Sequence, residues 1–597
     1  MTTTKALLTT VAVVALGAAS SAIAQEVGTP IETTAEALLN ADDTPENWLM
    51  YNGNYSNWHY SGLDEITPEN ASNLQIVYQA SIGGCTTRTV EGASCNEMSS
   101  PLAENGVVYV TDAHNKVMAF DVSSGDRAFP LWRFDPQVPR NDTSRGLALY
   151  GNNVIQTTAD ARIIAIDKAT GEVVWEATAQ EPVDEPNSAE AIATRVFSGP
   201  PNTYRTAGGK QIITAGPRGA GIGYMAAWDA ENEGQLLWRT YTIPQPGEPN
   251  FGTWPDDKWR WGAAMPWGAT PSFDPESNTL FFGTGEPSPV YDPEFRPGDN
   301  LYSVSTLALD ADTGEIKWFF QEVPNDQWDY DSTSTRILAE VDGRNVVFNW
   351  ARNGFIYNLD RATGEFLRAD AQVDNINWTA GIDEKTGKPL EYTPGAGLQE
   401  YAVAGPRRGR SEADAPAVCA TWGGGTTGIW SGSYDPSTGI TYNTRTTGCT
   451  YQTILRTTDE DFRPLAREGL GSSVRQVQVD TQAALIAIDT KTGEIVNSYV
   501  RDLGIPGDRQ AEVGALATAG GLVFTGFDDG SVSAFNKETL EEVWRHYNGM
   551  SQKGSMMSFG VDGKQYIAHI SGGDNPGSSG INSLTLPGAM LIVYGIR

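Results

Sequence analysis

A short acidic and aromatic stretch is the part of the sequence best suited to bind a cation. Residues 325–331 read Asn-Asp-Gln-Trp-Asp-Tyr-Asp and follow a strand-like run at residues 316–320. If the stretch is extended, Asp329 and Asp331 point to the same side, because side chains alternate along a strand. Two converging carboxylates repel each other unless a proton or a cation lies between them. The pattern predicts a hard cation bound through oxygen, and a solvated acidic loop is the alternative.

The beginning of the chain has the layout of a secretory signal. Lys5 precedes an apolar run, and Ala22 and Ala24 provide a small-residue cleavage site. No later run approaches the roughly 18 apolar residues that a membrane span needs. We therefore expect residues 1–24 to be a signal peptide. Residues 25–597 are expected to form one exported domain, which is periplasmic if the source is a Gram-negative cell.

Charge and cysteine content narrow the possible partners. The chain has 597 residues and a formal net charge of −33, which argues against nucleic acid. An acidic surface suits solubility, and it could also attract a basic protein partner. The four cysteines fit an oxidising compartment, and their spacing makes Cys85–Cys95 and Cys419–Cys449 the simplest pairing. No Cys-x-x-Cys-His is present, so no c-type haem is expected on this chain.

An internal repeat organises the rest of the sequence. The form Ala-x-Asp-x-x-Thr-Gly-Glu-x-x-Trp is complete at residues 165–175 and 308–318. Each copy predicts a strand, a tight turn that needs an Asx-type cap and a glycine, and a second strand. The final tryptophan is placed to wedge between one sheet and the next. Weaker copies begin at Ala119, Ala227, Leu359, Ala487 and Ala534.

These seven motifs, set among many short alternating runs, predict an all-β protein. An eighth blade, closed by residues 591–594 against N-terminal chain, would complete a ring and hide the sheet edges. The sequence therefore predicts an eight-bladed β-propeller with tryptophan-docking motifs. The longest insertions between motifs fall at residues 240–267, 287–300 and 366–419. Such insertions are expected to cap a site on one face.

Three further stretches stand in a characteristic order. They are Phe-Gly-Thr-Gly-Glu-Pro at residues 282–287, Arg-Pro-Gly-Asp-Asn at 296–300, and Trp-Asp-Tyr-Asp at 328–331. Together with the repeat, they make nearly the whole mature chain resemble the pyrroloquinoline quinone (PQQ)-dependent alcohol dehydrogenases. The resemblance implies PQQ and one hard cation as cofactors. It also implies an alcohol as substrate and, because no haem is expected here, a separate soluble cytochrome c as electron acceptor.

The resemblance implies a catalytic and metal-binding group. It implies that Asp329 is the catalytic base and also contacts the ion. It implies that the positive charge of Arg352 stabilises the quinone oxygen. Asp331 matches a second aspartate of lanthanide-using members, and a trivalent ion needs more anionic oxygen than calcium does. A lanthanide is therefore favoured, with calcium as the alternative. Glu286 stands where relatives usually have Asn, so Glu286, Asp329 and Asp331 are the predicted metal ligands.

A second group of residues is predicted to hold PQQ. Arg145 and Ser198 match residues that bind PQQ carboxylates, and Trp267 matches the ring that stacks under the cofactor. Arg218 falls where relatives carry a glutamate ligand, and it is expected to pair with a PQQ carboxylate or with a metal ligand. A slipped alignment in the glycine-rich segment is the alternative. Glu97 lies near a cofactor-contacting position, offset by one residue.

The remaining departures concern the substrate side. Two family tryptophans are replaced, one by Glu512 and one within residues 571–573, which indicates a roomier and more polar pocket. We therefore expect a bulky or secondary alcohol, a polyol or a sugar. Cys419–Cys449 matches a family disulfide. A non-catalytic scaffold of the outer-membrane assembly type and a metal-dependent hydrolase or lyase are the other classes considered, although the four histidines form no spaced cluster.

Overall fold

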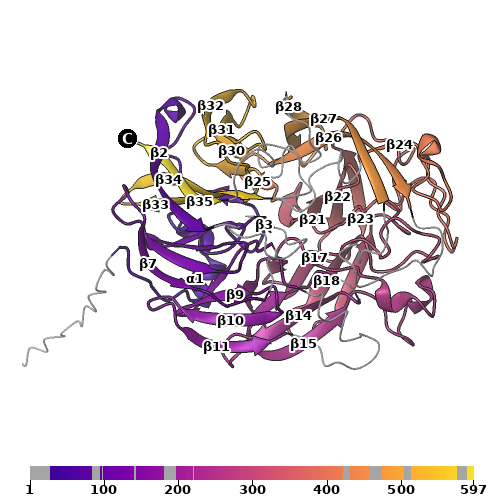
Figure 1. Ribbon diagram of the computed structural model, residues 1–597, viewed down its shortest axis with the longest axis horizontal. Helices are drawn as coiled ribbons and strands as arrows, with labels where there is room; N and C mark the ends of the chain where they lie inside the picture. The colour runs from indigo at the N-terminus through magenta and orange to yellow at the C-terminus, as the bar shows by residue number, and fades with distance from the viewer. Residues whose placement is uncertain are drawn as a thin grey trace, which may run out of the picture.

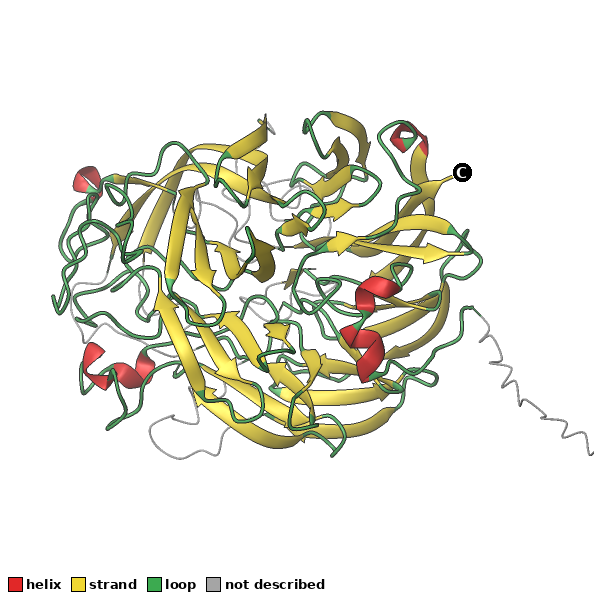
Figure 2. Ribbon diagram, turned by 180° about the vertical axis from the view of Figure 1, so that it is seen from behind, coloured by secondary structure: helices red, strands yellow, loops and turns green. Residues whose placement is uncertain are grey.

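The computed structural model describes residues 27–83, 95–96, 98–139, 143–179, 196–219, 221–420, 431–455, 474–502, 513–574 and 588–597. The predicted signal peptide lies outside these ranges. Figure 2 shows a molecule built mainly of strands, with only a few short helices. In these ranges no helix is both long and apolar enough to cross a membrane. The helices are α1 (Ala35–Leu39), η1 (Ala41–Asp43), η2 (Ala71–Asn73), η3 (Phe251–Thr253), η4 (Trp259–Trp261) and η5 (Glu412–Asp414).

The described strands form eight sheets, five of which are four-stranded antiparallel meanders that follow chain order. The first two contain β4 (Leu102–Glu104), β5 (Val107–Thr111), β6 (Val117–Asp121) and β7 (Phe129–Phe134), then β8 (Ala148–Tyr150), β9 (Asn153–Thr157), β10 (Arg162–Asp167) and β11 (Val173–Thr178). The other three contain β12 (Asn202–Arg205), β13 (Gln211–Ala215), β14 (Tyr224–Asp229) and β15 (Gln235–Tyr241), then β16 (Ser272–Asp274), β17 (Thr279–Gly283), β18 (Ser305–Asp310) and β19 (Ile316–Gln321), then β20 (Arg336–Val341), β21 (Arg344–Trp350), β22 (Phe355–Asp360) and β23 (Phe366–Ala371).

The other three sheets are five-stranded, and two of them contain strands from the N-terminal part of the chain. One combines β24 (Ala417–Cys419) with β25 (Ser433–Asp435), β26 (Ile440–Ile454), β27 (Val474–Asp489) and β28 (Ile495–Arg501). The next adds β1 (Tyr60–Ser61) to β29 (Leu516–Thr518), β30 (Leu522–Gly526), β31 (Ser531–Asn536) and β32 (Glu542–Tyr547). The last contains β33 (Met557–Val561), β34 (Lys564–Asp574), β35 (Ala589–Ile596), β3 (Cys95–Asn96) and the N-terminal strand β2 (Leu74–Gly83).

The sheets follow one another around a disc in chain order, so that the yellow C-terminal strands lie beside the indigo N-terminal ones (Figure 1). The ring closes where β2 pairs antiparallel with β35, from Leu74 opposite Ile596 to Gly83 opposite Ala589. This is the predicted closure of C-terminal against N-terminal chain. The fold is a β-propeller, and its described sheets equal in number the eight predicted blades.

The tryptophan of the repeat connects neighbouring sheets, as the sequence predicts. Trp238 donates its indole N–H to the carbonyl of Ala311 at 3.0 Å, in the turn of the next sheet. A Cβ on Gly314 of that turn would lie 2.6 Å from the Trp238 ring, so the contact requires glycine. Three other tryptophans make the equivalent hydrogen bond from the indole N–H to a backbone carbonyl: Trp132 to Lys168, Trp318 to Arg361, and Trp544 to Leu74.

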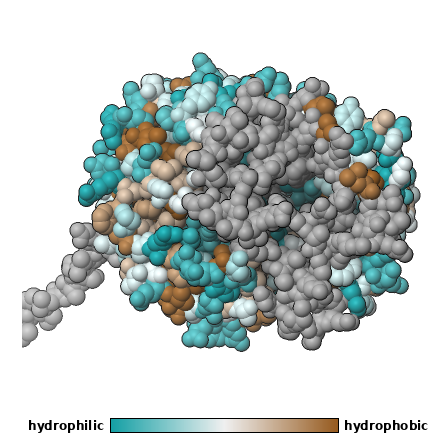
Figure 3. All heavy atoms as spheres, viewed as in Figure 1, coloured by the Kyte–Doolittle hydropathy of each residue, from teal (hydrophilic) through white to brown (hydrophobic). Residues whose placement is uncertain are grey.

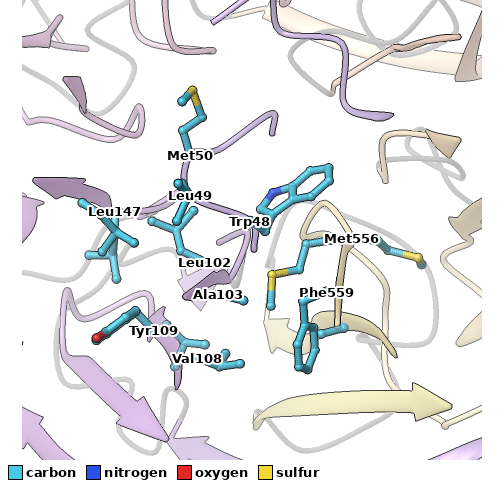
Figure 4. Close-up of a cluster of buried hydrophobic side chains, with 14 of the residues drawn as sticks. Trp48, Leu49, Met50, Leu102, Ala103, Val108, Tyr109, Leu147, Met556 and Phe559 are labelled. Atoms are coloured by element: carbon cyan, nitrogen blue, oxygen red, sulfur yellow. The ribbon is translucent and has the colours of Figure 1, made fainter. Parts of the chain in front are cut away.

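The start of the chain fills the gap between the first and last sheets. Figure 4 shows residues 48–50 between Leu102 and Ala103 on one side and Met556 and Phe559 on the other. All of these side chains are buried. On the face seen in Figure 3, the described residues are mainly hydrophilic, with a few scattered apolar patches. The core is therefore continuous across the closure.

The long insertions pack against one another. In a meander, the loop between the second and third strands lies at the same end as the connection to the next sheet, so these insertions share one face. Asn300 donates its backbone N–H to Thr253 at 3.0 Å, and Gly298 donates to Gly397 at 2.7 Å. Contacts between the three insertions hold together the loops that carry the predicted site residues.

Candidate active site

The loop that carries Asp329 and Asp331 is irregular, so the prediction of an extended backbone is wrong. The carboxylate of Asp326 accepts hydrogen bonds from the backbone N–H groups of Trp328 at 3.2 Å, Asp329 at 3.1 Å and Tyr330 at 3.1 Å. These bonds close a tight turn in which Asp329 has a φ of 72°. The predicted alternation of side chains still holds, because Trp328 and Tyr330 are buried in an aromatic cluster while the two acids face the site.

Glu286, Asp329 and Asp331 converge as predicted. One carboxylate oxygen from each lies within 4.8 Å of the others, and the three residues are only 6%, 7% and 2% exposed. Asp331 Oδ1 accepts the backbone N–H of Glu286 at 3.1 Å and the indole N–H of Trp267 at 3.2 Å. Gly285 permits this approach, since a Cβ there would lie 2.6 Å from Asp331 Oδ1. The cluster is therefore built from backbone and side chains of three loops.

The electrostatics of the cluster favour a bound cation. Burial, and then the charges of Asp331 and Asp329, raise the pKa of Glu286 well above its usual range. Burial and the charge of Asp331 likewise raise the pKa of Asp329, while Arg352 and Tyr291 oppose the shift. Carboxylates that are costly to ionise side by side become favourable ligands when a hard cation neutralises them.

Arg352 is the positive charge of the site. Its Nη1 lies 2.7 Å from Asp331 Oδ2, 3.1 Å from the carbonyl of Asp329 and 3.6 Å from Asp329 Oδ1. Burial opposes its charge, but the neighbouring carboxylates hold its pKa above the usual value. One guanidinium against three carboxylates leaves the cluster short of positive charge. The side chains therefore fit one multivalent ion bound through oxygen.

Three of the residues predicted to hold PQQ lie together beside this cluster. The guanidinium of Arg145 stands over the ring of Trp267, 5.0 Å from its centroid. Arg145 Nη1 donates to the carbonyl of Ser198 at 3.2 Å, and Ser198 Oγ donates to the carbonyl of Trp267 at 3.4 Å. Trp267 is only partly buried, and its indole N–H reaches Asp331. A half-covered aromatic ring with an arginine beside it fits a flat, anionic cofactor.

For the other predicted site residues, the structure gives less information about their contacts with the site. Arg218 forms a backbone bridge with Val196, two residues before Ser198, and its expected contact with the cofactor or a ligand remains a prediction. Glu97 and Glu512 lie outside the described residues, as does Cys85, so the Cys85–Cys95 pairing is untested. Cys419 and Cys449 are bonded across β24 and β26, as predicted.

The sequence reasoning missed Tyr291 and the role of Arg296. The hydroxyl of Tyr291 donates to Asp329 Oδ2 at 2.9 Å, and both residues are buried. Arg296, from the Arg-Pro-Gly-Asp-Asn stretch, donates to the carbonyls of Val290 at 2.8 Å and Asp326 at 2.5 Å. The sequence did contain a signal for Tyr291, because this residue lies between the family-like stretches at residues 282–287 and 296–300.

The family assignment follows from comparison with known proteins. The family model described as "PQQ: glucose/ethanol/alcohol dehydrogenase, beta-propeller domain" matches residues 48–369 and 475–567, which is most of the chain. The chain belongs to this PQQ-dependent dehydrogenase family. The family match favours the dehydrogenase interpretation over the scaffold and hydrolase alternatives.

Curated and solved relatives agree with this assignment. The chain is 32% identical to quinoprotein alcohol dehydrogenase PedH of Pseudomonas putida, covering 90% of this chain and 88% of the relative. It is 31% identical to the putative dehydrogenase XoxF of Paracoccus denitrificans, covering 90% and 89%. The solved quinohemoprotein alcohol dehydrogenase ADHIIG of Pseudomonas putida HK5 superposes with a TM-score of 0.78 at 26% identity, covering 96% of this chain and 83% of that one. A europium-containing methanol dehydrogenase shares the fold, with a TM-score of 0.77 at 24% identity, covering 94% and 100%.

Proposed function

We propose that this chain is a periplasmic alcohol dehydrogenase that uses PQQ and one hard cation. The observation that carries the proposal is the buried cluster of Glu286, Asp329 and Asp331, with oxygens within 4.8 Å of one another. Buried carboxylates are costly unless they are neutralised, and an ion held by all three would neutralise them. Because Asp331 adds a further anionic ligand, a lanthanide is favoured, with calcium as the alternative.

The residues of the site divide the chemistry among them. Arg145, Ser198 and Trp267 would hold PQQ, which when bound supplies the acceptor for the carbinol hydrogen and its electron pair. Asp329 accepts the proton of the substrate hydroxyl as general base. Arg352 supplies positive charge where negative charge develops during the reaction. The expected substrate is a bulky or secondary alcohol, a polyol or a sugar.

The acceptor of the electrons is proposed to be a soluble cytochrome c. The net charge of −33 would attract a basic cytochrome over a long range. Such steering weakens as salt screens the charges. The rate of cytochrome reduction should therefore fall as ionic strength rises, while reduction of a small neutral dye should change little.

Reconstitution tests the proposed reaction. The purified, ion-free protein is mixed with PQQ and either Ca²⁺ or La³⁺, and dye bleaching is followed with methanol, secondary alcohols, polyols and sugars. Turnover should require both PQQ and an ion. Asp329→Ala should retain PQQ and lose turnover, whereas Asp383→Ala, in an exposed turn outside the site, should behave as wild type. Loading with PQQ and an ion but no turnover on any alcohol would contradict the proposal.

A further inference from the structure

Tyr291 contributes to the site from the same loop as the predicted ligand Glu286. It lies in the insertion between β17 and β18, five residues after Glu286. Its hydroxyl donates to Asp329 Oδ2 at 2.9 Å, and the two residues are 9% and 7% exposed. A buried hydrogen bond to a carboxylate is stronger than one between neutral groups and has a defined direction. The contact therefore fixes the orientation of the Asp329 side chain.

The two loops that meet in this contact are connected by a buried arginine. Arg296 is fully buried and donates to the carbonyls of Pro289 at 3.0 Å and Val290 at 2.8 Å, next to Tyr291. Its Nη2 also donates to the carbonyl of Asp326 at 2.5 Å, in the turn that precedes Asp329. Asp292, on the other side of Tyr291, pairs with Arg408 at 2.8 Å. The hydroxyl is thus aimed by a loop held on both sides.

The remaining polar atoms of Asp329 have different partners. Its backbone N–H donates to Asp326 at 3.1 Å, and its carbonyl accepts from Arg352 at 3.1 Å. With Oδ2 bound to Tyr291, the oxygen left is Oδ1, which faces Arg352 Nη1 at 3.6 Å. No described residue donates a hydrogen bond to Oδ1 at 3.5 Å or less. The two oxygens of one carboxylate therefore meet different surroundings.

We propose that Tyr291 is a positioning residue that assigns the two oxygens of Asp329 to different tasks. Tyr291 holds Oδ2, and Oδ1 is the oxygen that accepts the substrate proton. In that step the O–H bond of the alcohol breaks, its proton bonds to Oδ1, and the C–O bond becomes a carbonyl; PQQ, when bound, would supply the acceptor for the carbinol hydrogen and its electron pair. The inference rests on the proposed function, since it assumes that Asp329 is the base. Without Tyr291 the carboxylate rotates, and fewer encounters place Oδ1 correctly.

Tyr291→Phe removes the hydroxyl and keeps the ring. The expected result is a fall in kcat on the order of 10- to 100-fold, the size of one hydrogen bond to a charged group. KM should stay within about threefold, because the variant retains the residues proposed to bind the ion and the cofactor. Tyr401→Phe is the matched control, since Tyr401 is buried, packs on Trp328 and donates to the carbonyl of Pro324 in the same region. That variant should keep the wild-type kcat.

Binding measurements separate positioning from a general structural role. Terbium(III) affinity, measured by luminescence titration, and PQQ retention, measured by absorbance, should be similar in Tyr291→Phe, Tyr401→Phe and wild type. The midpoints of thermal unfolding of the three proteins should also be similar. Equal kcat in Tyr291→Phe and wild type would overturn the inference, and so would equal losses in both variants. Loss of terbium or PQQ binding in Tyr291→Phe would also overturn it, because Tyr291 would then serve ligand binding. If wild type itself shows no PQQ-dependent turnover, the proposed function fails instead, and the comparison identifies which proposal is wrong.

Discussion

At the scale of single residues, the properties of the site depend on how its buried carboxylates are neutralised. Asp331 contacts Arg352 at 2.7 Å, the backbone of Glu286 at 3.1 Å and Trp267 at 3.2 Å. It therefore links the metal-ligand group to the residue proposed to stack with PQQ. One side chain with this many partners affects the ion and the cofactor together, so its charge and its shape have to be tested separately.

Asp331→Asn separates them, because it keeps the shape and one carbonyl oxygen while removing the charge. A trivalent ion loses more from one missing anionic ligand than a divalent ion does. We expect La³⁺-dependent turnover to fall at least about tenfold further than Ca²⁺-dependent turnover, corresponding to about 1.4 kcal/mol. The measurement is initial rate against ion concentration for each ion. Equal losses with both ions would count against a lanthanide site.

A buried histidine outside the predicted ligand set should lower the stability of the protein at acid pH. His569 on β34 is fully buried, stacks on Tyr594 at 5.8 Å, and neither ring nitrogen has a hydrogen-bond partner among the described residues. Burial, followed by the charge of His546, lowers the pKa of His569 from 6.5 to about 3. Between pH 6.5 and 3, the unfolded chain therefore binds a proton that the native protein does not. The free energy of unfolding consequently decreases as the pH is lowered through this range.

His569→Phe should remove this dependence. The phenyl ring of the variant fills a space similar to that of the imidazole, and it has no nitrogen that would be buried without a hydrogen-bond partner. At pH 5, the lost protonation term corresponds to about 2 kcal/mol in favour of the variant, whereas at pH 8 only the packing difference remains. Thermal midpoints at the two pH values measure this. A gain of the same size at both would mean that protonation of His569 has no part in it.

At the scale of elements, local chemistry explains what the sequence could predict. The Asp-x-x-Thr-Gly turn depends on neighbouring residues alone: Asp310 accepts from the backbone of Asp312 and Thr313, both at 3.1 Å. The repeat therefore predicted turns, strands and docking tryptophans. The partner of Tyr291 was not predictable, because Tyr291 and Asp329 are 38 residues apart and meet only once the insertions pack. The left-handed backbone of Asp329 likewise depends on the Asp326 turn.

The docking tryptophans should contribute most of the energy between adjacent sheets. Trp238 is 8% exposed, donates to Ala311 and covers Gly314. Trp238→Ala should cost about 3–5 kcal/mol, from lost burial, the cavity and one hydrogen bond. Leu236, on the same strand but 43% exposed, provides the control, and Leu236→Ala should change stability little. Chemical denaturation compares the two variants, and similar losses in both would refute sheet-to-sheet docking by Trp238.

At the scale of the whole molecule, the ring has one seam, and β35 lies in it. β35 pairs with β34 on one side and β2 on the other, so its loss would expose two sheet edges at once. Leu591, Ile592, Val593 and Tyr594 are each at most 1% exposed. At about 1.5–3 kcal/mol for each buried apolar side chain, these four together contribute about 6–12 kcal/mol, which is comparable to the whole stability of a typical domain.

A chain ending at residue 588 should therefore fail to close. We expect it to aggregate or to lose a cooperative thermal transition, because among the described strands only β35 joins β2 to β34. Removal of Arg597 alone is the control, since it deletes one hydrogen bond, to the carbonyl of Val77 at 2.9 Å, and leaves β35 intact. Size-exclusion chromatography and thermal scans distinguish the two. If the chain ending at residue 588 stayed monomeric with a wild-type midpoint, pairing of β35 would not be what holds the ring together, and the packing of residues 48–50 between the first and last sheets would have to suffice.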